Sequence, residues 1–187
     1  MSTSPSEPVI QVIRTWLAEI IIGLNFCPFA KREFERNSIR YLVSGEQDNK
    51  HALSVLLDEL ALLDGASEVE TTLIIFHKGF SLFDDYLDLV DLANALLEQG
   101  GYGGIFQLAT FHPAYCFADA AMDDPANFTN RAPYPILHIL RESSINRVLR
   151  TYPEPESIPD NNIAKARGLG LSHWQELMSR LDGSRDT

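Results

Sequence analysis

The sequence has few basic residues and few cysteines, and each shortage excludes a class of protein. Its 187 residues contain 15 Lys and Arg against 26 Asp and Glu, so the formal net charge is −11. Because nucleic-acid binding needs clustered basic side chains to contact phosphates, we expect no nucleic-acid partner. Two cysteines are too few for a disulfide scaffold or for a zinc site built from four cysteines.

Long apolar runs are missing as well. No segment reaches the roughly 18 consecutive apolar residues that a membrane span requires. The longest such stretch near the N-terminus, 18–24, is interrupted by Glu19 and Gly23, and the first eight residues lack the basic start of a secretory signal. We therefore expect a cytoplasmic protein with reduced thiols and no membrane partner. The oligomeric state stays open.

The remaining composition is that of a folded protein, since 45% of the residues are apolar. Hydrophobic spacing and turn residues predict helices over 8–23, 48–64, 81–100, 133–150 and 172–181, and strands over 39–43, 71–76 and 105–111. This alternation predicts a single α/β domain whose small, mainly parallel or mixed sheet of three to four strands is flanked by helices. The alternative is a two-layer α+β sandwich in which residues 114–118 add an antiparallel strand.

The chain divides into three parts by composition. Residues 1–7 are small and polar and are expected to be loose, and residues 8–150 form the α/β core. Residues 151–187 begin with a Pro/Glu-rich segment that we expect to wrap over the surface in an extended form. A short C-terminal helix then packs on the core.

Histidines follow two of the predicted strands. His77 and His112 each come directly after an apolar run. If the strands are parallel, both side chains lie at the carboxyl edge of the sheet, where ligands of open α/β sheets bind. The proline after His112 favours an extended exit that holds it in place. The alternative is that both are ordinary turn residues.

The predicted helix over 133–150 carries ionisable groups among apolar neighbours. His138 and Glu142 are four residues apart and so share one face, and Arg141 lies beside them. Such groups are costly to bury unless they are paired or functional. They indicate either a polar pocket or a structural salt bridge. As an alternative, His112, His138 and Glu142 are candidate ligands of a divalent metal such as zinc.

Two loops add further candidates. Cys27 lies in a loop next to Pro28, with Lys31 and Arg32 close behind, which favours a nucleophilic thiol of lowered pKa or else a small buried side chain. Asn130 and Arg131 precede the predicted helix over 133–150, where an anionic group would find a favourable position. Phosphate-binding glycine motifs and a Gly-x-Ser-x-Gly elbow are missing.

Four stretches resemble the bacterial family named domain of unknown function 1415. They are Gly23–Ala30, Phe111–Tyr115, Asn130–Glu142 and Tyr152–Pro159 followed by Asn162 and Ile163. The resemblance covers nearly the whole chain and implies membership of that family, whose name supplies no activity. It adds that the candidate residues lie within the family's signature stretches: Cys27, His112, Arg131, His138, Arg141 and Glu142.

These observations lead to two hypotheses about function. In the first, the chain is an enzyme for a small anionic metabolite, with His112, His138, Glu142 and Cys27 as catalytic candidates. Substrate-binding candidates are Asn130, Arg131 and Arg141, whose side chains suit a carboxylate or phosphate. In the second, the same pocket serves a non-catalytic module that senses a ligand or docks a protein. The sequence leaves the cofactor open.

Overall fold

A computed structural model describes residues 6–66 and 68–183 of the chain. Four strands form one open sheet: β1 (Ile39–Ser44), β2 (Thr71–Phe76), β3 (Phe106–Phe111) and β4 (Ile136–Arg141). The longer helices before β4 are α1 (Ser6–Trp16), α3 (Asn49–Gly65) and α4 (Phe83–Gln99), and those after it are α5 (Glu142–Leu149), α6 (Ile158–Leu169) and α7 (Leu171–Gly183). Shorter helical segments are η1 (Leu17–Ile22), α2 (Ala30–Glu35), η2 (Pro125–Thr129) and η3 (Pro155–Ser157).

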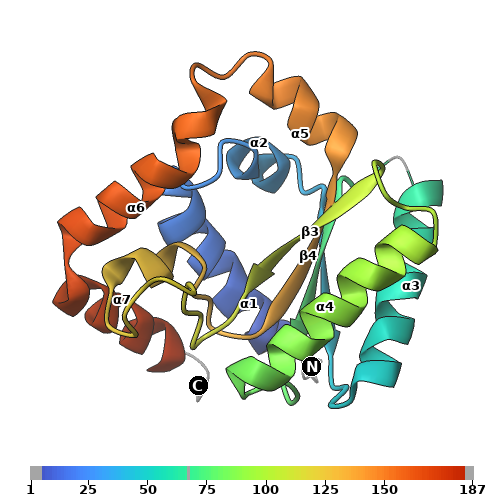
Figure 1. Ribbon diagram of the computed structural model, residues 1–187, viewed down its shortest axis with the longest axis horizontal. Coiled ribbons are helices and arrows are strands. Elements are labelled where there is room, and N and C mark those ends of the chain that lie inside the picture. Colours follow the sequence, from blue (N-terminus) through green and yellow to red (C-terminus); the bar gives the residue numbers. More distant parts are fainter. Residues whose placement is uncertain (1–5, 67, 184–187) are drawn as a thin grey trace.

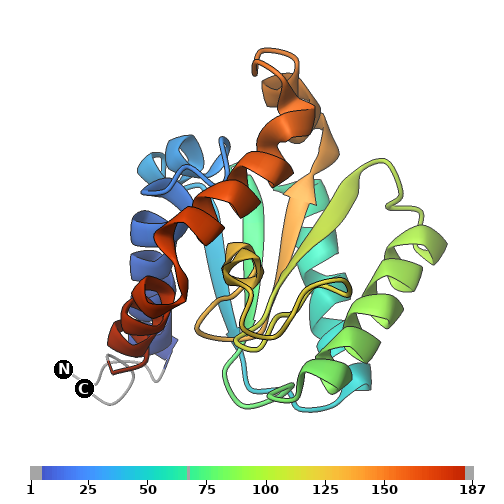
Figure 2. The same cartoon turned by 60° about the vertical axis from the view of Figure 1, so that its left-hand side comes forward.

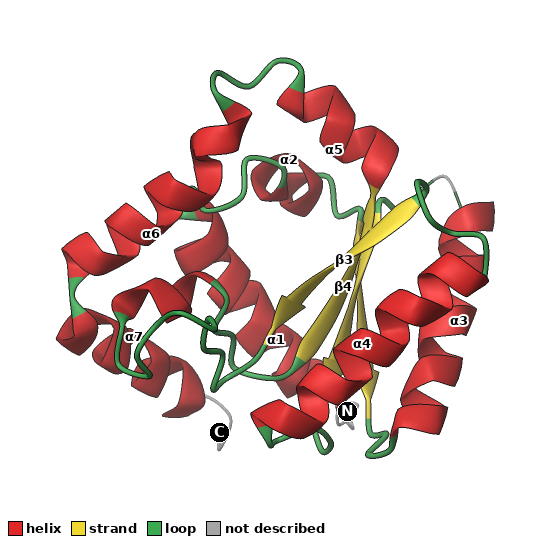
Figure 3. Ribbon diagram, viewed as in Figure 1, coloured by secondary structure: helices red, strands yellow, loops and turns green. Residues whose placement is uncertain are grey.

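The sheet is mixed, and its strand order is β1-β2-β4-β3. β1 and β2 are parallel, whereas β4 runs antiparallel to both of its neighbours, so β1, β2 and β3 point the same way (Figure 3). This arrangement confirms a single α/β domain with a mixed sheet of four strands. Residues 114–118 lie in the loop after β3 and are not a strand, and the antiparallel strand of the sheet is β4.

Helices cover both faces of this sheet. Side chains alternate along β2, so Leu73 and Ile75 join a core with α1, η1, α6 and α7, while Ile74 and Phe76 join a second core with α3 and α4. Figures 1 and 2 show α3 and α4 on the side of the sheet opposite α1. The two-layer alternative, with helices on one face, is therefore wrong.

The predicted helix over 133–150 is wrong in its first half. Residues 136–141 form the buried strand β4, and the helix α5 begins only at Glu142. A strand that is covered on both faces is a continuous apolar run, which hydrophobic periodicity does not separate from a buried helix. The consequence is that His138 and Glu142 do not share a helix face.

The C-terminal part contains more helix than expected. The segment 152–159, which we expected to be extended, contains η3 and the first turn of α6. Helices α6 and α7 then cover residues 158–183, where one short helix over 172–181 was expected. Pro159 lies in the first turn of α6, where its missing N–H and fixed φ are tolerated. At the other end, residues 1–5 of the segment expected to be loose lie outside the described residues, and Ser6 and Glu7 already belong to α1.

None of the helices in the described ranges has the length and apolar character that a membrane crossing requires.

One helical segment has an unusual hydrogen-bond pattern. The segment η1 continues α1 as a π-helix, in which the Gly23 N–H donates to the Ala18 carbonyl five residues earlier. Three of its side chains, Leu17, Ile20 and Ile21, are buried in the first core.

Thr72 provides a test of the packing between β2 and the second core. Its side chain is fully buried, and its Oγ1 has no hydrogen-bond partner, which leaves a desolvated hydroxyl uncompensated. We expect Thr72→Val to raise the free energy of unfolding by about 1 kcal/mol. Chemical denaturation of the two proteins measures the difference.

Thr71→Val is the matched control on the same strand. Thr71 Oγ1 makes two hydrogen bonds, so this variant should lose about 1–3 kcal/mol of stability. A loss of similar size in Thr72→Val would contradict the assignment of its hydroxyl as unpaired.

Candidate functional site

A cavity lies between the sheet and the helices α1, α2, α5 and α6. Its volume is about 390 Å³. Strands β2, β3 and β4 contribute Thr71, Leu73, Phe111, His138 and Leu140. Figure 1 shows α2, α5 and α6 on the same side of the sheet as α1. The cavity lies against the face of the sheet and not at the carboxyl edge of the strands, where the sequence placed the site.

Most of the lining is apolar. It includes side chains from helices and loops that are far apart in the sequence, among them Trp16, Leu17, Ile21, Phe29, Val148 and Ile163. Two of these residues, Leu17 and Ile21, come from the π-helix η1. Because π-helical turns are rare and occur often at functional sites, their presence here supports the cavity as the candidate site.

Helix α6 forms hydrogen bonds to the loop that carries Cys27. The Asn162 side chain in α6 donates to the Phe26 carbonyl at 2.7 Å, and Lys165 Nζ donates to the Leu24 carbonyl at 2.6 Å. Farther along α6, the Arg167 guanidinium pairs with the Asp124 carboxylate at 2.7 Å. Helix α6 therefore holds one side of the cavity in place.

The polar centre of the cavity is a pair of side chains on adjacent strands. His138 Nε2 lies 2.7 Å from Thr71 Oγ1, and the same hydroxyl donates to the Ile139 carbonyl at 2.5 Å. Burial lowers the pKa of His138 to about 4. The imidazole is therefore neutral at pH 7.

Three other sequence candidates line the same cavity, and two of them hold the fold together. The Asn130 amide donates to the Thr110 carbonyl at 3.1 Å, and the Arg141 guanidinium donates to three backbone carbonyls between residues 63 and 69. The third is Cys27, whose thiol forms no hydrogen bond with His138. The structure thus brings four candidates to one cavity: Cys27, Asn130, His138 and Arg141.

His112 does not line the cavity. Its ring is fully buried, Nε2 donates to the Phe80 carbonyl at 2.9 Å, and Nδ1 accepts from the Ala114 N–H at 3.0 Å. Burial lowers the pKa of His112, so the ring is neutral. Both nitrogens are occupied by the backbone, and the ring serves to join loops at the end of β3.

Arg131 and Glu142 also lie outside the cavity lining. The Arg131 guanidinium donates to the carbonyls of Tyr115 and Met122 and lies 4.5 Å from the centre of the Phe128 ring. Glu142 is the first residue of α5, and its N–H donates to the Ile105 carbonyl. Arg131 therefore stabilises the loop after β3.

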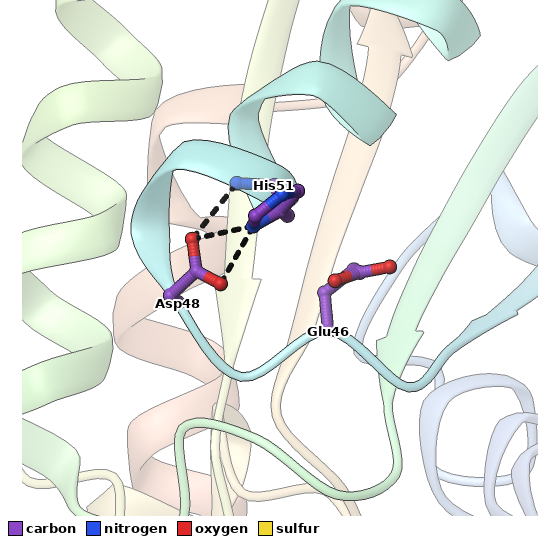
Figure 4. A group of neighbouring side chains, drawn as sticks. All are labelled: Glu46, Asp48 and His51. Atoms are coloured by element: carbon purple, nitrogen blue, oxygen red, sulfur yellow. Dashed lines mark hydrogen bonds and ion pairs between the residues drawn. The ribbon is translucent and has the colours of Figure 1, made fainter.

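The proposed metal ligands are not brought together. Because both nitrogens of His112 are bonded to the backbone, that ring cannot join His138 and Glu142 around an ion. Within residues 6–66 and 68–183, the group of possible ligand atoms lying within 4.8 Å of one another is Glu46, Asp48 and His51 (Figure 4). There the Asp48 carboxylate caps α3 by accepting from the His51 N–H, so the cluster has a structural explanation.

Comparison with known proteins identifies the family. The family model described as "Protein of unknown function (DUF1415)" matches residues 8–176. The chain belongs to this family. No curated protein and no solved structure matches the chain.

The cavity of this DUF1415 protein also contains a residue that the sequence did not single out. Thr71 opens the apolar run 71–76, where it has the appearance of an ordinary β-branched strand residue. Only the register of β2 against β4 places its hydroxyl beside His138. A threonine at the start of a buried strand gives no local signal of that contact.

Cys27 does not have the lowered pKa that its neighbours suggested. Burial raises the pKa of the thiol, and the backbone N–H groups of Phe29 and Ala30 offset this only in part. Lys31 and Arg32 are paired with the carboxylates of Glu35 and Glu33. The thiol is therefore protonated at neutral pH and is a weak nucleophile.

Alkylation kinetics test this assignment. In a Cys116→Ser variant of the DUF1415 protein, Cys27 is the one remaining thiol. We expect iodoacetamide to label it at pH 7.5 at least about tenfold more slowly than free cysteine, since the thiolate is the reactive form. Labelling at the rate of free cysteine would restore the nucleophile hypothesis. Urea-unfolded protein supplies the control rate.

The neutral state of His138 predicts a pH dependence of stability. Its pKa is about 4 in the folded protein and about 6.5 when unfolded, so the unfolded chain binds the extra proton first. Stability contributed by neutral His138 is complete above pH 6.5 and is lost as the pH falls toward 4, by about 3 kcal/mol in total.

Urea denaturation at several pH values, compared between the protein and a His138→Phe variant, isolates this contribution. The free energy of unfolding of the protein minus that of the variant should decrease as the pH falls from 6.5 to 4. A difference that does not change with pH would mean that His138 is not desolvated in the folded state.

Proposed function

We propose that this DUF1415 protein binds a small, largely apolar molecule in the cavity between the sheet and the helices α1, α2, α5 and α6. The observation that carries the proposal is the combination of a mostly apolar wall with a hydrogen-bonded polar pair on the sheet, His138 and Thr71. Ligand sites in proteins have this composition, with volumes of about 300–1,000 Å³. The volume of this cavity, about 390 Å³, falls within that range.

Binding is favoured over catalysis by the protonation states of the two reactive side chains. A general base works best when its pKa lies near the working pH, and the pKa of His138 is about 4. A cysteine nucleophile needs a lowered pKa or an adjacent base, and the pKa of Cys27 is raised. We therefore assign the His138 ring to recognition, and acid–base catalysis by His138 is the second candidate function.

The orientation of the arginines favours an apolar ligand over an anionic one. The guanidiniums of Arg131 and Arg141, which we considered for a carboxylate or phosphate, are bonded to backbone carbonyls. Arg32 and Arg147 also line the cavity, but both are exposed and each is bonded to a neighbour on its own helix. An anionic group is therefore left with partners at the solvent-exposed side only.

A large side chain that fills the cavity tests the proposal. Val148 and Asn146 lie on the same helix, α5, but Val148 lines the cavity and Asn146 is exposed and does not. The probe is N-phenyl-1-naphthylamine, an uncharged aromatic molecule whose fluorescence rises in apolar surroundings. We expect Val148→Trp to weaken its binding at least about tenfold, because the added ring occupies the cavity.

Asn146→Trp is the control, since it adds the same ring to the same helix outside the cavity. Its dissociation constant for the naphthylamine should match that of the unaltered protein. Equal binding by both variants, or no binding by the unaltered protein, would contradict the proposed function.

A further inference from the structure

The hydrogen bonds of Thr71 determine which nitrogen of His138 carries the proton. A threonine hydroxyl has one hydrogen, and a carbonyl oxygen can only accept. Because Thr71 Oγ1 lies 2.5 Å from the Ile139 carbonyl, its hydrogen is directed there. The contact between Thr71 Oγ1 and His138 Nε2, at 2.7 Å, must then use a hydrogen on Nε2. The neutral ring therefore has an unprotonated Nδ1.

That second nitrogen has no partner within the protein. No hydrogen bond to His138 Nδ1 exists among residues 6–66 and 68–183, whereas Nε2 is bonded to Thr71. The side-chain polar atoms that are sealed from solvent and unpaired in those ranges are Tyr41 Oη and Thr72 Oγ1, and His138 Nδ1 is not one of them. Nδ1 thus keeps accessible surface, and the cavity is the space that His138 lines.

The surroundings of Nδ1 restrict what can satisfy it. Most of the strand residues that line the cavity with His138 are apolar, and the Phe111 ring lies next to the imidazole at 6.4 Å between centres. A carboxylate would face the Nδ1 lone pair with lone pairs of its own, and protonation of the ring is opposed by burial. A hydroxyl group, in contrast, donates to Nδ1 and leaves both partners uncharged.

We infer that the cavity selects an uncharged molecule with an apolar body and one hydroxyl group, such as an alkylphenol or a hydrophobic alcohol, whose O–H donates to His138 Nδ1. This inference rests on the proposed function, because it specifies the ligand class for the same cavity. Thr71 is the positioning residue: it touches His138 and fixes the tautomer that presents the acceptor.

Three probes with the same apolar body separate the possible ligand classes. They are 4-tert-butylphenol, 4-tert-butylanisole and 4-tert-butylbenzoate, which offer a hydroxyl donor, no donor and an anion respectively. At pH 7.5 the phenol stays protonated, since phenols titrate near pH 10. Calorimetric titration of the full chain measures each dissociation constant.

We expect the phenol to bind about tenfold more tightly than the anisole, which corresponds to one hydrogen bond in an apolar site. The benzoate should bind more weakly than the phenol. Equal affinities for phenol and anisole would overturn the inference. Tightest binding by the benzoate would also overturn it, and would favour the anionic ligand of the sequence analysis.

Two variants assign the preference to the imidazole. In His138→Phe the ring shape is kept and the acceptor is removed, so the preference for phenol over anisole should disappear while the anisole affinity stays within about threefold. Thr72→Val is the matched control on β2, because Thr72 lies between the cavity-lining residues Thr71 and Leu73 and so faces the other side of the sheet, and it should keep the full preference. A preference that survives His138→Phe would overturn the role of Nδ1.

The naphthylamine measurement distinguishes the two levels of the proposal. If it binds and none of the three tert-butyl probes does, the hydroxyl inference fails and the proposed function stands. If the naphthylamine does not bind, the proposed function fails, and the hydroxyl inference, which rests on it, fails as well. The probe comparison uses the unaltered chain, so its outcome does not depend on whether His138→Phe folds.

Discussion

The position of β4 between β2 and β3 is the constraint on which the candidate site depends. As an inner strand it is covered on both faces, and successive side chains alternate between them. His138 therefore faces the cavity, while Leu137 and Ile139 face the core of α3 and α4. A shift of one residue in the register would exchange these sets and bury an unpaired imidazole among aliphatic side chains.

Two residues of β4, His138 and Arg141, have different roles, although the sequence analysis placed them side by side on one helix. His138 and Arg141 are three residues apart and would be neighbours on a helix, but on a strand an odd separation places them on opposite faces. Arg141 accordingly contacts carbonyls at the end of α3 and in the loop after it, and it lies over the Phe106 ring. His138 forms the polar centre of the cavity, whereas the Arg141 guanidinium, although Arg141 also lines the cavity, holds the end of α3 to the sheet.

Much of the fold could be predicted from the sequence, since three strands carry local signals. The β-branched run 71–76 and the alternation in 39–43 predicted β2 and β1, and the helix predicted over 48–64 corresponds to α3. The run 136–141 carries no such signal, because an inner strand and a buried helix can have the same apolar composition. Cys27 and His138 were recognised as candidates by residue type, although their protonation states follow from burial, which is a tertiary property.

The π-helical turn at 17–22 determines where two residues of the cavity wall lie. A π turn contains one residue more than an α turn, and the two residues that it contributes to the wall, Leu17 and Ile21, depend on that extra residue for their placement. A deletion of one residue here would restore a regular α-helix and rotate the chain that follows by about 100°. The loop that carries Phe26 and Cys27 would then no longer line the cavity. The cavity therefore depends on the length of the first helical segment, to the single residue.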